Sequence, residues 1–425
     1  MKKIVTACIF IVLMSLGASS QDKIIAVVSI EGNDRTRTNF LKRLAFVKEG
    51  AILDSVRIAS DVRRFKLLPA VASADYKINN LGDGEFEIIY TIVENFAIIP
   101  GLNISNAPNG DFAFRTSIFD FNFLGRNQII GGFYSRNVFD SFGVYWEAPN
   151  LLTRKLGIGL NYQNNVLLEP VFFDNDATVN YKFNTRAVEI KMQYEHNFHN
   201  RFELGLNISA QEYDFDNGDE PLEAPLSLGI DTVAVIGEYE YNGINIDYQY
   251  QSGFRSILSY NVLLGSNGDN DLLRNAFIGR NDFEYFKRVG ERGNWANRLS
   301  VAYASNSTTP FAALIVDNQL NIRGVGNSVD RGSAAVVFNT EYRYTLYEKG
   351  WFVLQSNVFV DTGIWQDPGG NLGDLVSASN NRVYPGGGIR FIHKRIFNAV
   401  FRLDYGIGLG DNATSGIVFG IGQYF

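Results

Sequence analysis

The chain has 425 residues, a formal net charge of −7 and a single cysteine, Cys8. One cysteine excludes a disulfide framework and a thiolate metal cluster. A negative chain without a sustained Lys/Arg block has no electrostatic basis for binding nucleic acid. The 33 Phe, 21 Tyr and 41 Gly beside only 10 Pro favour strands and tight turns over helices.

Residues 1–20 have the pattern of a cleaved signal peptide. Lys2 and Lys3 precede an apolar stretch from Ile4 to Leu16, and small residues follow it up to Ser20. Thirteen apolar residues are too few to span roughly 30 Å of hydrocarbon, which disfavours the alternative of a membrane anchor. We therefore expect export, with loss of Cys8.

Residues 22–95 predict a small α/β domain of order β-α-α-β-β. A β-rich run over 24–30 precedes two segments of helical periodicity, the first capped by Thr36 and the second by Asp54 or Ser55 and stopped by Pro69. Two strands, 72–78 and 86–93, flank a Gly/Asn/Asp-rich hairpin loop. The text "VVSIEGNDRTRTNFLKRLAFVKEGAILD", with "EIIYTIVEN" further on, resembles a POTRA domain.

From about Phe96 onward the hydrophobicity alternates with a period of two. In 188–195, for example, Val, Ile, Met and Tyr alternate with Glu, Lys and Gln, and 203–210, 338–346 and 398–407 behave alike. A soluble sandwich also alternates, but these runs extend to about nine to twelve residues, the length of a tilted membrane-spanning strand. Aromatic residues gather near the strand ends, as in an interfacial girdle.

The length that remains predicts the size of a barrel. About 330 residues, at about twenty per strand and connection, make about 16 antiparallel strands, an even number as in bacterial barrels. Tight turns alternate with long polar loops such as 214–230 and 306–332. The expected fold class is membrane all-β, a transmembrane barrel over 96–425 preceded by one small α/β periplasmic domain over 22–95.

The motifs between 320 and 425 resemble those of the BAM/TAM superfamily of POTRA-plus-barrel outer-membrane proteins, also called the bacterial surface antigen family. They are "NIRGVGNSV", "FNTEYRYTL", "FVDTGIW", "YPGGGIRF", "FRLDYGIGL" and "GIGQYF", and "FNFLGRNQ" and "EAPNL" resemble earlier strands. Val325 stands where the family usually has Phe or Tyr. The resemblance covers essentially the whole mature chain, and the order of the motifs between 320 and 425 is specific.

The resemblance implies a loop latch inside the barrel. Arg323 and Gly324 form the loop tip, and by strand parity Glu341 and Asp361 face inward, with Gly363 on the same strand as Asp361. A charge-assisted pair in the lumen would hold the tip there. The alternative is that these charges are merely solvated. The resemblance also implies a C-terminal barrel signal on an alternating strand, with Phe419, Ile421 and Phe425 as its residues.

Other candidates carry weaker interpretations. We expect a solvent-facing turn rather than a metal site at His196 and His199. An ordinary solvated loop is expected for the loop acids Asp214, Asp216, Asp219 and Glu220. Gly386 to Gly388 predict a bend or a bulge. No nucleophile elbow, phosphate loop or His-supported nucleophile is present, so we expect no catalytic residues, metal or cofactor.

The resemblance implies a function in inserting outer-membrane proteins or translocating polypeptides. A single POTRA-like domain favours an accessory or specialised paralogue. Expected partners are outer-membrane lipid, client polypeptides at the sheet edge of 72–93, and periplasmic or lipoprotein subunits. The expected location is the outer membrane of a Gram-negative-type bacterium. The alternatives are a passive pore and a two-partner-secretion-type transporter.

Overall fold

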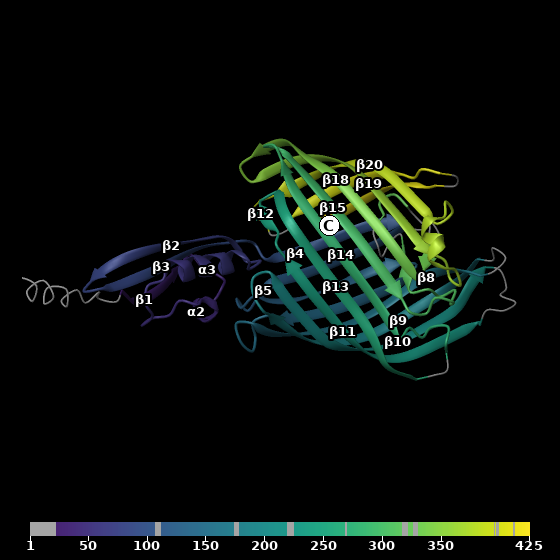
Figure 1. The fold of residues 1–425 in the computed structure, drawn as a ribbon, viewed down its shortest axis with the longest axis horizontal. Coiled ribbons are helices and arrows are strands. Elements are labelled where there is room, and N and C mark those ends of the chain that lie inside the picture. The colour runs from purple at the N-terminus through teal and green to yellow at the C-terminus, as the bar shows by residue number, and fades with distance from the viewer. Residues whose placement is uncertain are drawn as a thin grey trace, which may run out of the picture. The chain divides into compact units, whose positions relative to one another are not determined.

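The chain divides into two compact units, Met1–Glu94 and Asn95–Phe425 (Figure 1). The structure is a computed structural model that describes residues 23–106, 112–173, 178–218, 225–267, 270–316, 322–325, 330–394, 396, 399–410 and 413–425. The predicted signal peptide and the acids Asp219 and Glu220 lie outside these residues.

The first unit has the predicted order β-α-α-β-β. It comprises β1 (Ile24–Glu31), α2 (Thr38–Leu44), α3 (Ser55–Lys66), β2 (Val71–Gly82) and β3 (Glu85–Glu94). The sheet order is β1-β3-β2, with β1 parallel and β2 antiparallel to β3. None of the helices in the described part of the chain has the length and apolar character needed to cross a membrane.

One of the two predicted helix caps is wrong. Asp54 caps α3 as expected, because its carboxylate accepts the backbone N–H groups of Val56 and Arg57. The first residue before α2, however, is Arg37, which makes no side-chain cap. Thr36 lies one position too early and is buried, and its backbone N–H donates to Glu94 of β3. The start of α2 is thus held by the sheet.

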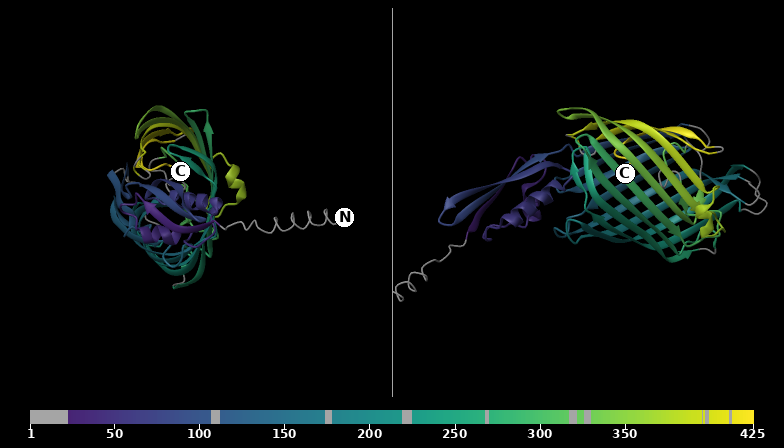
Figure 2. Two further views of the ribbon diagram at one scale, coloured as in Figure 1. Left: turned by 90° about the vertical axis from the view of Figure 1, so that its left-hand side faces the viewer. Right: turned by 45° about the horizontal axis from the view of Figure 1, so that its top comes forward.

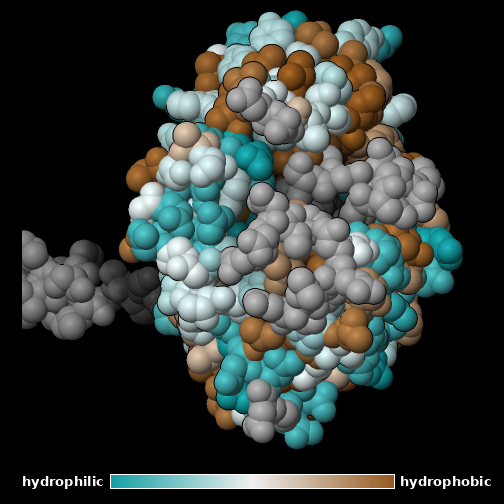
Figure 3. All heavy atoms as spheres, turned by 90° about the vertical axis from the view of Figure 1, so that its right-hand side faces the viewer, coloured by the Kyte–Doolittle hydropathy of each residue, from teal (hydrophilic) through white to brown (hydrophobic). Residues whose placement is uncertain are grey.

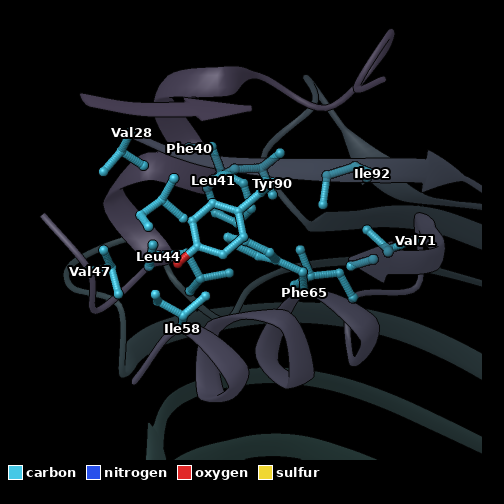
Figure 4. Close-up of a cluster of buried hydrophobic side chains, with 14 of the residues drawn as sticks. Val28, Phe40, Leu41, Leu44, Val47, Ile58, Phe65, Val71, Tyr90 and Ile92 are labelled. Atoms are coloured by element: carbon cyan, nitrogen blue, oxygen red, sulfur yellow. The ribbon is translucent and has the colours of Figure 1, made fainter. Parts of the chain in front are cut away.

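Both helices pack on one core around Tyr90, the centre of the close-up in Figure 4. Asp61 of α3 places a fully buried carboxylate beside this core. Its carboxylate accepts the backbone N–H groups of Phe46 and Val47 at 2.6 and 2.9 Å, and the Tyr90 hydroxyl at 3.0 Å. Burial, reinforced by the neighbouring Asp61 charge, raises the pKa of the Tyr90 hydroxyl. A buried carboxylate with three donors therefore joins α3, the segment after α2 and the sheet.

The two outer edges of this sheet differ. Along the first half of β1 the edge is covered, because Ile25 exchanges backbone hydrogen bonds with Gly50 and Ala51 and Leu53 donates to Lys23. The strand order leaves β2 as the other edge, and no described residue is registered against its outer side. An uncovered edge strand presents backbone groups to another extended chain.

The second unit is a closed barrel (Figures 1 and 2). Within the described residues it has 16 long antiparallel strands, which confirms the predicted fold class. They are β4 (Ile98–Asn106), β5 (Phe112–Phe123), β6 (Gln128–Asn137), β7 (Phe139–Ala148), β8 (Leu156–Phe172), β9 (Thr178–Glu195), β10 (Asn200–Gly218), β11 (Ser227–Asn242), β13 (Tyr250–Asn267), β14 (Phe277–Val289), β15 (Gly293–Ala304), β18 (Ala334–Lys349), β19 (Phe352–Gln366), β20 (Asn381–His393), β21 (Val400–Ile407) and β22 (Ser415–Ile421).

Four short elements accompany the 16 long strands. Strand β12 (Asn245–Asp247) folds back on the start of β13, and β16 (Leu314–Ile315) pairs with β17 (Arg331–Gly332) inside the long segment between β15 and β18. The 3-10 turn η1 (Leu372–Val376) follows β19.

The alternation predicted from the sequence sorts side chains onto the two faces of the wall. On β9, Val188, Ile190 and Met192 are 42–53% exposed on the outside, and their neighbours Glu189 and Lys191 face inward. The same holds for β10, β18 and β21. The outer side of these strands is apolar enough to lie in lipid.

Figure 3 views one end of the barrel, where described side chains of both hydrophilic and hydrophobic character gather.

Two strand boundaries differ from the expectation. Strand β10 continues to Gly218 and β11 begins at Ser227, so both ends of the predicted loop, 214–218 and 227–230, are barrel wall. The last strand ends at Ile421, because Gly422, at φ +102°, turns the chain out of the wall. Phe425 therefore does not lie on the strand.

Neighbouring long strands of the wall are registered over at least seven residue pairs, except where the first and last strands meet. Strand β21 pairs with β22 from Phe401 to Ile407, whereas the register between β22 and β4 contains Phe419 with Ile104 alone. Pro100 in β4 has no N–H to donate, and proline within sheets is confined to edge positions. The junction of β4 and β22 is the seam of the barrel.

We expect Tyr90→Phe to destabilise the first unit by about 1–2 kcal/mol, because Asp61 loses one donor in a dry core. The loss should depend on pH. A raised folded-state pKa means that the Tyr90 hydroxyl favours folding below its unfolded pKa of about 10, and that this contribution disappears as pH rises further. Urea unfolding of residues 22–94 between pH 7 and pH 11 measures both effects.

Tyr76→Phe is the matched control, since Tyr76 is only partly buried beside the same core. The control should lose less than half as much stability as Tyr90→Phe. Equal losses in the two variants, or an unchanged pH dependence in Tyr90→Phe, would contradict the role given to the Asp61–Tyr90 hydrogen bond.

Candidate functional site

The site is built around Arg323, at the tip of the long segment between β15 and β18. Its side chain is fully buried. Nε and Nη2 donate to the two carboxylate oxygens of Asp361 at 2.8 and 2.9 Å, and the backbone N–H of Arg323 adds a third bond to Asp361 at 2.9 Å. Nη1 donates to Glu341 at 2.7 Å. The three residues singled out in the sequence thus lie together in one ion-paired group.

Glu341 is shared by three arginines. Besides Arg323 it accepts from Nε of Arg343 at 2.5 Å and from Nη2 of Arg390 at 2.8 and 2.9 Å. The parity of β18 explains the convergence, because Glu341 and Arg343 face inward on one strand while Tyr342 between them is 37% exposed outside. Asp404 of β21 lies 3.6 Å from Nη1 of Arg323 and completes the group.

Two aromatic rings enclose the guanidinium group. Cζ of Arg323 lies 3.6 Å from the ring centroid of Phe359 on β19 and 4.4 Å from that of Tyr424. Val325, the position that departs from the family pattern, is instead buried in an apolar cluster with Ile322. The stacking on the arginine therefore comes from the wall and from the segment after β22.

Glycines set how closely the tip approaches the wall. Gly324 has φ +90°, and a Cβ there would lie 2.6 Å from the backbone oxygen of Gly406 on β21. In the reverse direction, a Cβ on Gly406 would lie 2.3 Å from the backbone oxygen of Arg323. Gly363 leaves room for Ile322, whose Cδ1 lies 2.6 Å from the position of the missing Cβ. The backbone of the tip thus packs directly on the backbone of the barrel.

The expected bend or bulge at Gly386 to Gly388 is wrong. Strand β20 keeps an unbroken register with both neighbours through these residues. A Cβ on Gly386 would lie 2.2 Å from the ring of Phe359, and one on Gly388 would lie 2.2 Å from the carboxylate of Asp404. These glycines therefore make space for the side chains that contact Arg323.

The remaining candidates make other contacts. Phe419 and Ile421 are on β22, whereas the Phe425 ring lies near Arg343, with its centroid 5.6 Å from Cζ, and near the inward Phe286. The His199 ring contacts the backbone oxygen of Asn242 at 2.7 Å. Asp214 accepts the Ser227 hydroxyl at 2.8 Å within the wall. Across the described ranges, no three His, Cys, Asp or Glu residues are grouped so as to hold a metal ion.

Sequence reasoning missed four contributors to the site: Arg343, Arg390, Asp404 and Tyr424. The first three were accessible in principle, because each faces inward by parity within a motif already singled out. Nothing in the sequence indicated that Tyr424 leaves the wall, since that depends on the turn at Gly422.

Chemically, this site binds rather than reacts. Every hydrogen-bonding nitrogen of Arg323 is directed at a carboxylate, and the carboxylates are engaged by guanidinium groups that remain protonated. Breaking one partner out of a buried group of this kind costs roughly 3–5 kcal/mol. The arrangement can therefore hold the tip against the wall with high occupancy.

We expect Arg323→Ala to release the tip, because it leaves Asp361 and Glu341 buried with fewer donors. Unheated protein should lose its compact gel migration at a temperature about 5 °C lower or more. Arg323→Lys should restore only part of the difference, because an ammonium group cannot reproduce the planar fork on Asp361. Asp361→Asn combined with Glu341→Gln should resemble Arg323→Ala, and the triple variant should add little.

Gly406→Ala provides a variant that leaves every charge in place. It should displace the tip through the contact with the Arg323 backbone, whereas Gly265→Ala should have no effect because a Cβ there meets nothing within 4 Å. Strictly additive losses in the charge variants would contradict a single coupled group.

Comparisons with known proteins agree with this architecture. No protein-family model and no curated protein sequence matches the chain. Among solved structures, BamA from Haemophilus ducreyi lacking POTRA domains 1–3 is similar, with a TM-score of 0.58 at 16% identity over 94% of this chain and 84% of that one. CdiB from Escherichia coli gives 0.66 at 11% identity, covering 94% and 76% of the two chains.

CdiB from Acinetobacter baumannii gives a TM-score of 0.64 at 13% identity, covering 95% of this chain and 74% of that one. The resemblance found in the sequence motifs is thereby confirmed at the level of fold. The chain has the fold of BamA and CdiB, a 16-strand antiparallel barrel preceded by a small α/β domain.

Proposed function

We propose that this protein is an outer-membrane assembly or translocation factor that opens its barrel wall at the seam for a client polypeptide. The observation that carries the proposal is the pairing between β22 and β4, where Phe419 and Ile104 alone are registered. Every other junction between neighbouring long strands is registered over at least seven residue pairs, as at β21–β22. Separating β22 from β4 costs fewer hydrogen bonds than opening the wall elsewhere.

An open seam would offer two unpaired strand edges to a client. Each edge could add a strand by backbone hydrogen bonding, which recognises extended polypeptide with little demand on sequence. The outward residues at the seam, Ile104 and Phe419, are apolar, so a client strand added there would meet lipid. This geometry suits a client that is itself an outer-membrane strand.

The small domain supplies a second edge. Strand β2 is uncovered, while the first half of β1 is blocked by residues 50–53. We place the client contact of this domain on β2, within the edge 72–93 expected from the sequence. In this proposal the domain lies in the periplasm and receives the client before the barrel does.

The latch at Arg323 supports a regulated opening. It fastens the loop tip to β18, β19 and β21, the strands that lead up to the seam. A barrel that served only as a passive pore would gain nothing from a weak junction beside a heavily fastened wall. The passive pore is the second outcome that the following experiment distinguishes.

We expect a disulfide between Ile104→Cys and Phe419→Cys to abolish function, because these residues face each other across the seam. Complementation of a deletion strain should fail under oxidising conditions and recover with a reductant. Cys8 should be replaced by Ala in all variants. A passive pore would instead keep its conductance and complement equally well in both states.

The matched control joins Leu403→Cys to Phe419→Cys, a registered pair one junction away between β21 and β22. It shares one position and the same membrane depth but leaves the seam free. Function should persist with this disulfide formed. Loss of function in both pairs would contradict a special role for the seam.

For the small domain, a photo-crosslinking amino acid at Lys77 on β2 should capture unfolded barrel proteins in cells. The same amino acid at Lys66, an exposed residue of α3, is the control. Mass spectrometry identifies the products. Equal capture at the two positions, or no capture at Lys77, would place the client contact elsewhere.

A further inference from the structure

The segment Gly422–Phe425 leaves the wall and lies against the inner face of the barrel. Gly422 donates to the backbone oxygen of Val400 at 2.7 Å and turns the chain inward. The Tyr424 ring then lies 4.4 Å from Cζ of Arg323 and 4.7 Å from Cζ of Arg402. This segment is the continuation of β22, one of the two strands of the seam.

Arg343 contacts three different parts of the chain, and both its Nε and its Nη2 lie 2.5 Å from Glu341. Nε donates to Glu341, which in turn binds Arg323 of the loop tip. Nη2 donates to the backbone oxygen of Phe425 at 3.2 Å, and Nη1 to the side chain of Gln251 at 3.3 Å. One fully buried guanidinium group therefore contacts the latch, the segment after β22 and the start of β13.

The Gln251 contact belongs to a hairpin that also lies against the inner wall. Both backbone groups of Gln251 bond the side chain of Asn294, at 2.8 and 2.9 Å, and the Tyr250 hydroxyl bonds Thr345 at 3.1 Å. Asn294 and Thr345 are buried on the inner faces of β15 and β18. The hairpin of β12 and β13 thus gives Arg343 a further contact, beside those with Glu341 and Phe425.

The length of the segment matches the part of β4 that lacks a partner at the seam. If the register of Phe419 with Ile104 continued in antiparallel order, Gln423 would lie opposite Pro100 and Phe425 opposite Ile98, the first residue of β4. Residues 422–425 are therefore long enough to complete the seam if the segment left the inner wall.

We propose that Arg343 is a positioning residue that holds Gly422–Phe425 on the inner wall and so couples the loop tip to the pairing of the seam. While Arg323, Glu341 and Arg343 are joined, the segment is kept from β4 and the seam stays short. When the group is broken, the segment extends β22 along β4. The inference goes beyond the proposed function, and its test does not measure client handling.

The test places Gln423→Cys and Pro100→Cys in a Cys8→Ala background and compares Arg343→Gln with the parent. Folded barrels are selected first by heat-dependent gel migration. In Arg343→Gln the disulfide should form at least threefold faster than in the parent. Arg298→Gln is the matched control: Cζ of Arg298 also lies 5.6 Å from the centroid of the Phe425 ring, but its Nη2 donates to Asn339 at 2.8 Å, whereas Arg343 donates to Glu341 of the latch.

A second measurement reports the loop tip. Trypsin cleaves after Arg323 only when that buried side chain is released, so Arg343→Gln should speed this cleavage at least threefold, and Arg343→Lys should recover part of the protection. Because coupling is reciprocal, forming the disulfide in the parent should also speed the cleavage. The last result separates coupling from general loss of stability.

If Arg343→Gln does not fold, Tyr424→Leu is measured instead, since it removes the ring from Arg323 and leaves Arg343 in place. It should change both readouts in the same direction. Equal disulfide rates in parent and variant, equal effects of Arg343→Gln and Arg298→Gln, or cleavage after Arg323 that ignores the disulfide would each overturn the proposal.

Discussion

The structure of the barrel depends on placing a guanidinium group where water does not reach. A fully buried Arg323 is tolerable only because two carboxylates and two aromatic rings already stand around its position. The carboxylates belong to β18, β19 and β21. The position of the loop tip therefore depends on how these strands are aligned with one another. The glycines at 386 and 388 follow from the same demand, because any side chain there would occupy the space of Phe359 or Asp404.

The small domain also buries a charged side chain and surrounds it with hydrogen-bonding partners. Asp61 is buried among apolar side chains and is satisfied by two backbone N–H groups and one hydroxyl. In both units a single carboxylate collects donors from segments far apart in the chain. Such a group specifies one arrangement of its neighbours more sharply than apolar packing alone, since a shifted register leaves a charge without partners.

The architecture could be predicted from the sequence because the period-two alternation is a local property of each strand. It does not depend on how the strands are aligned in the barrel. Arg323, Glu341 and Asp361 could be named because they stand within motifs whose order is specific. Arg343, Arg390 and Asp404 could not be assigned to the site, although the alternation placed Arg343 and Asp404 on the polar face and Arg390 stands within one of the motifs. Which inward residues contact each other depends on how neighbouring strands are shifted along one another. The alternation in a single sequence does not reveal that shift. The bulge expected at Gly386 to Gly388 was wrong for a related reason, since a glycine that bends a strand and one that makes room look alike until the neighbouring side chain is known.

The inner face of the wall is not supported evenly. From β15 to β21 the described residues carry the loop tip, the hairpin of β12 and β13 and the segment after β22. Strand β4 bears none of these contacts and has a proline, Pro100, near its beginning. The seam is therefore a boundary between a stiff sheet edge, which is held on two sides, and a compliant one. Lateral pressure from a bilayer would therefore be resisted unequally by the two strands of the seam, with β22 braced from the inside by the contacts of its neighbours and β4 without them.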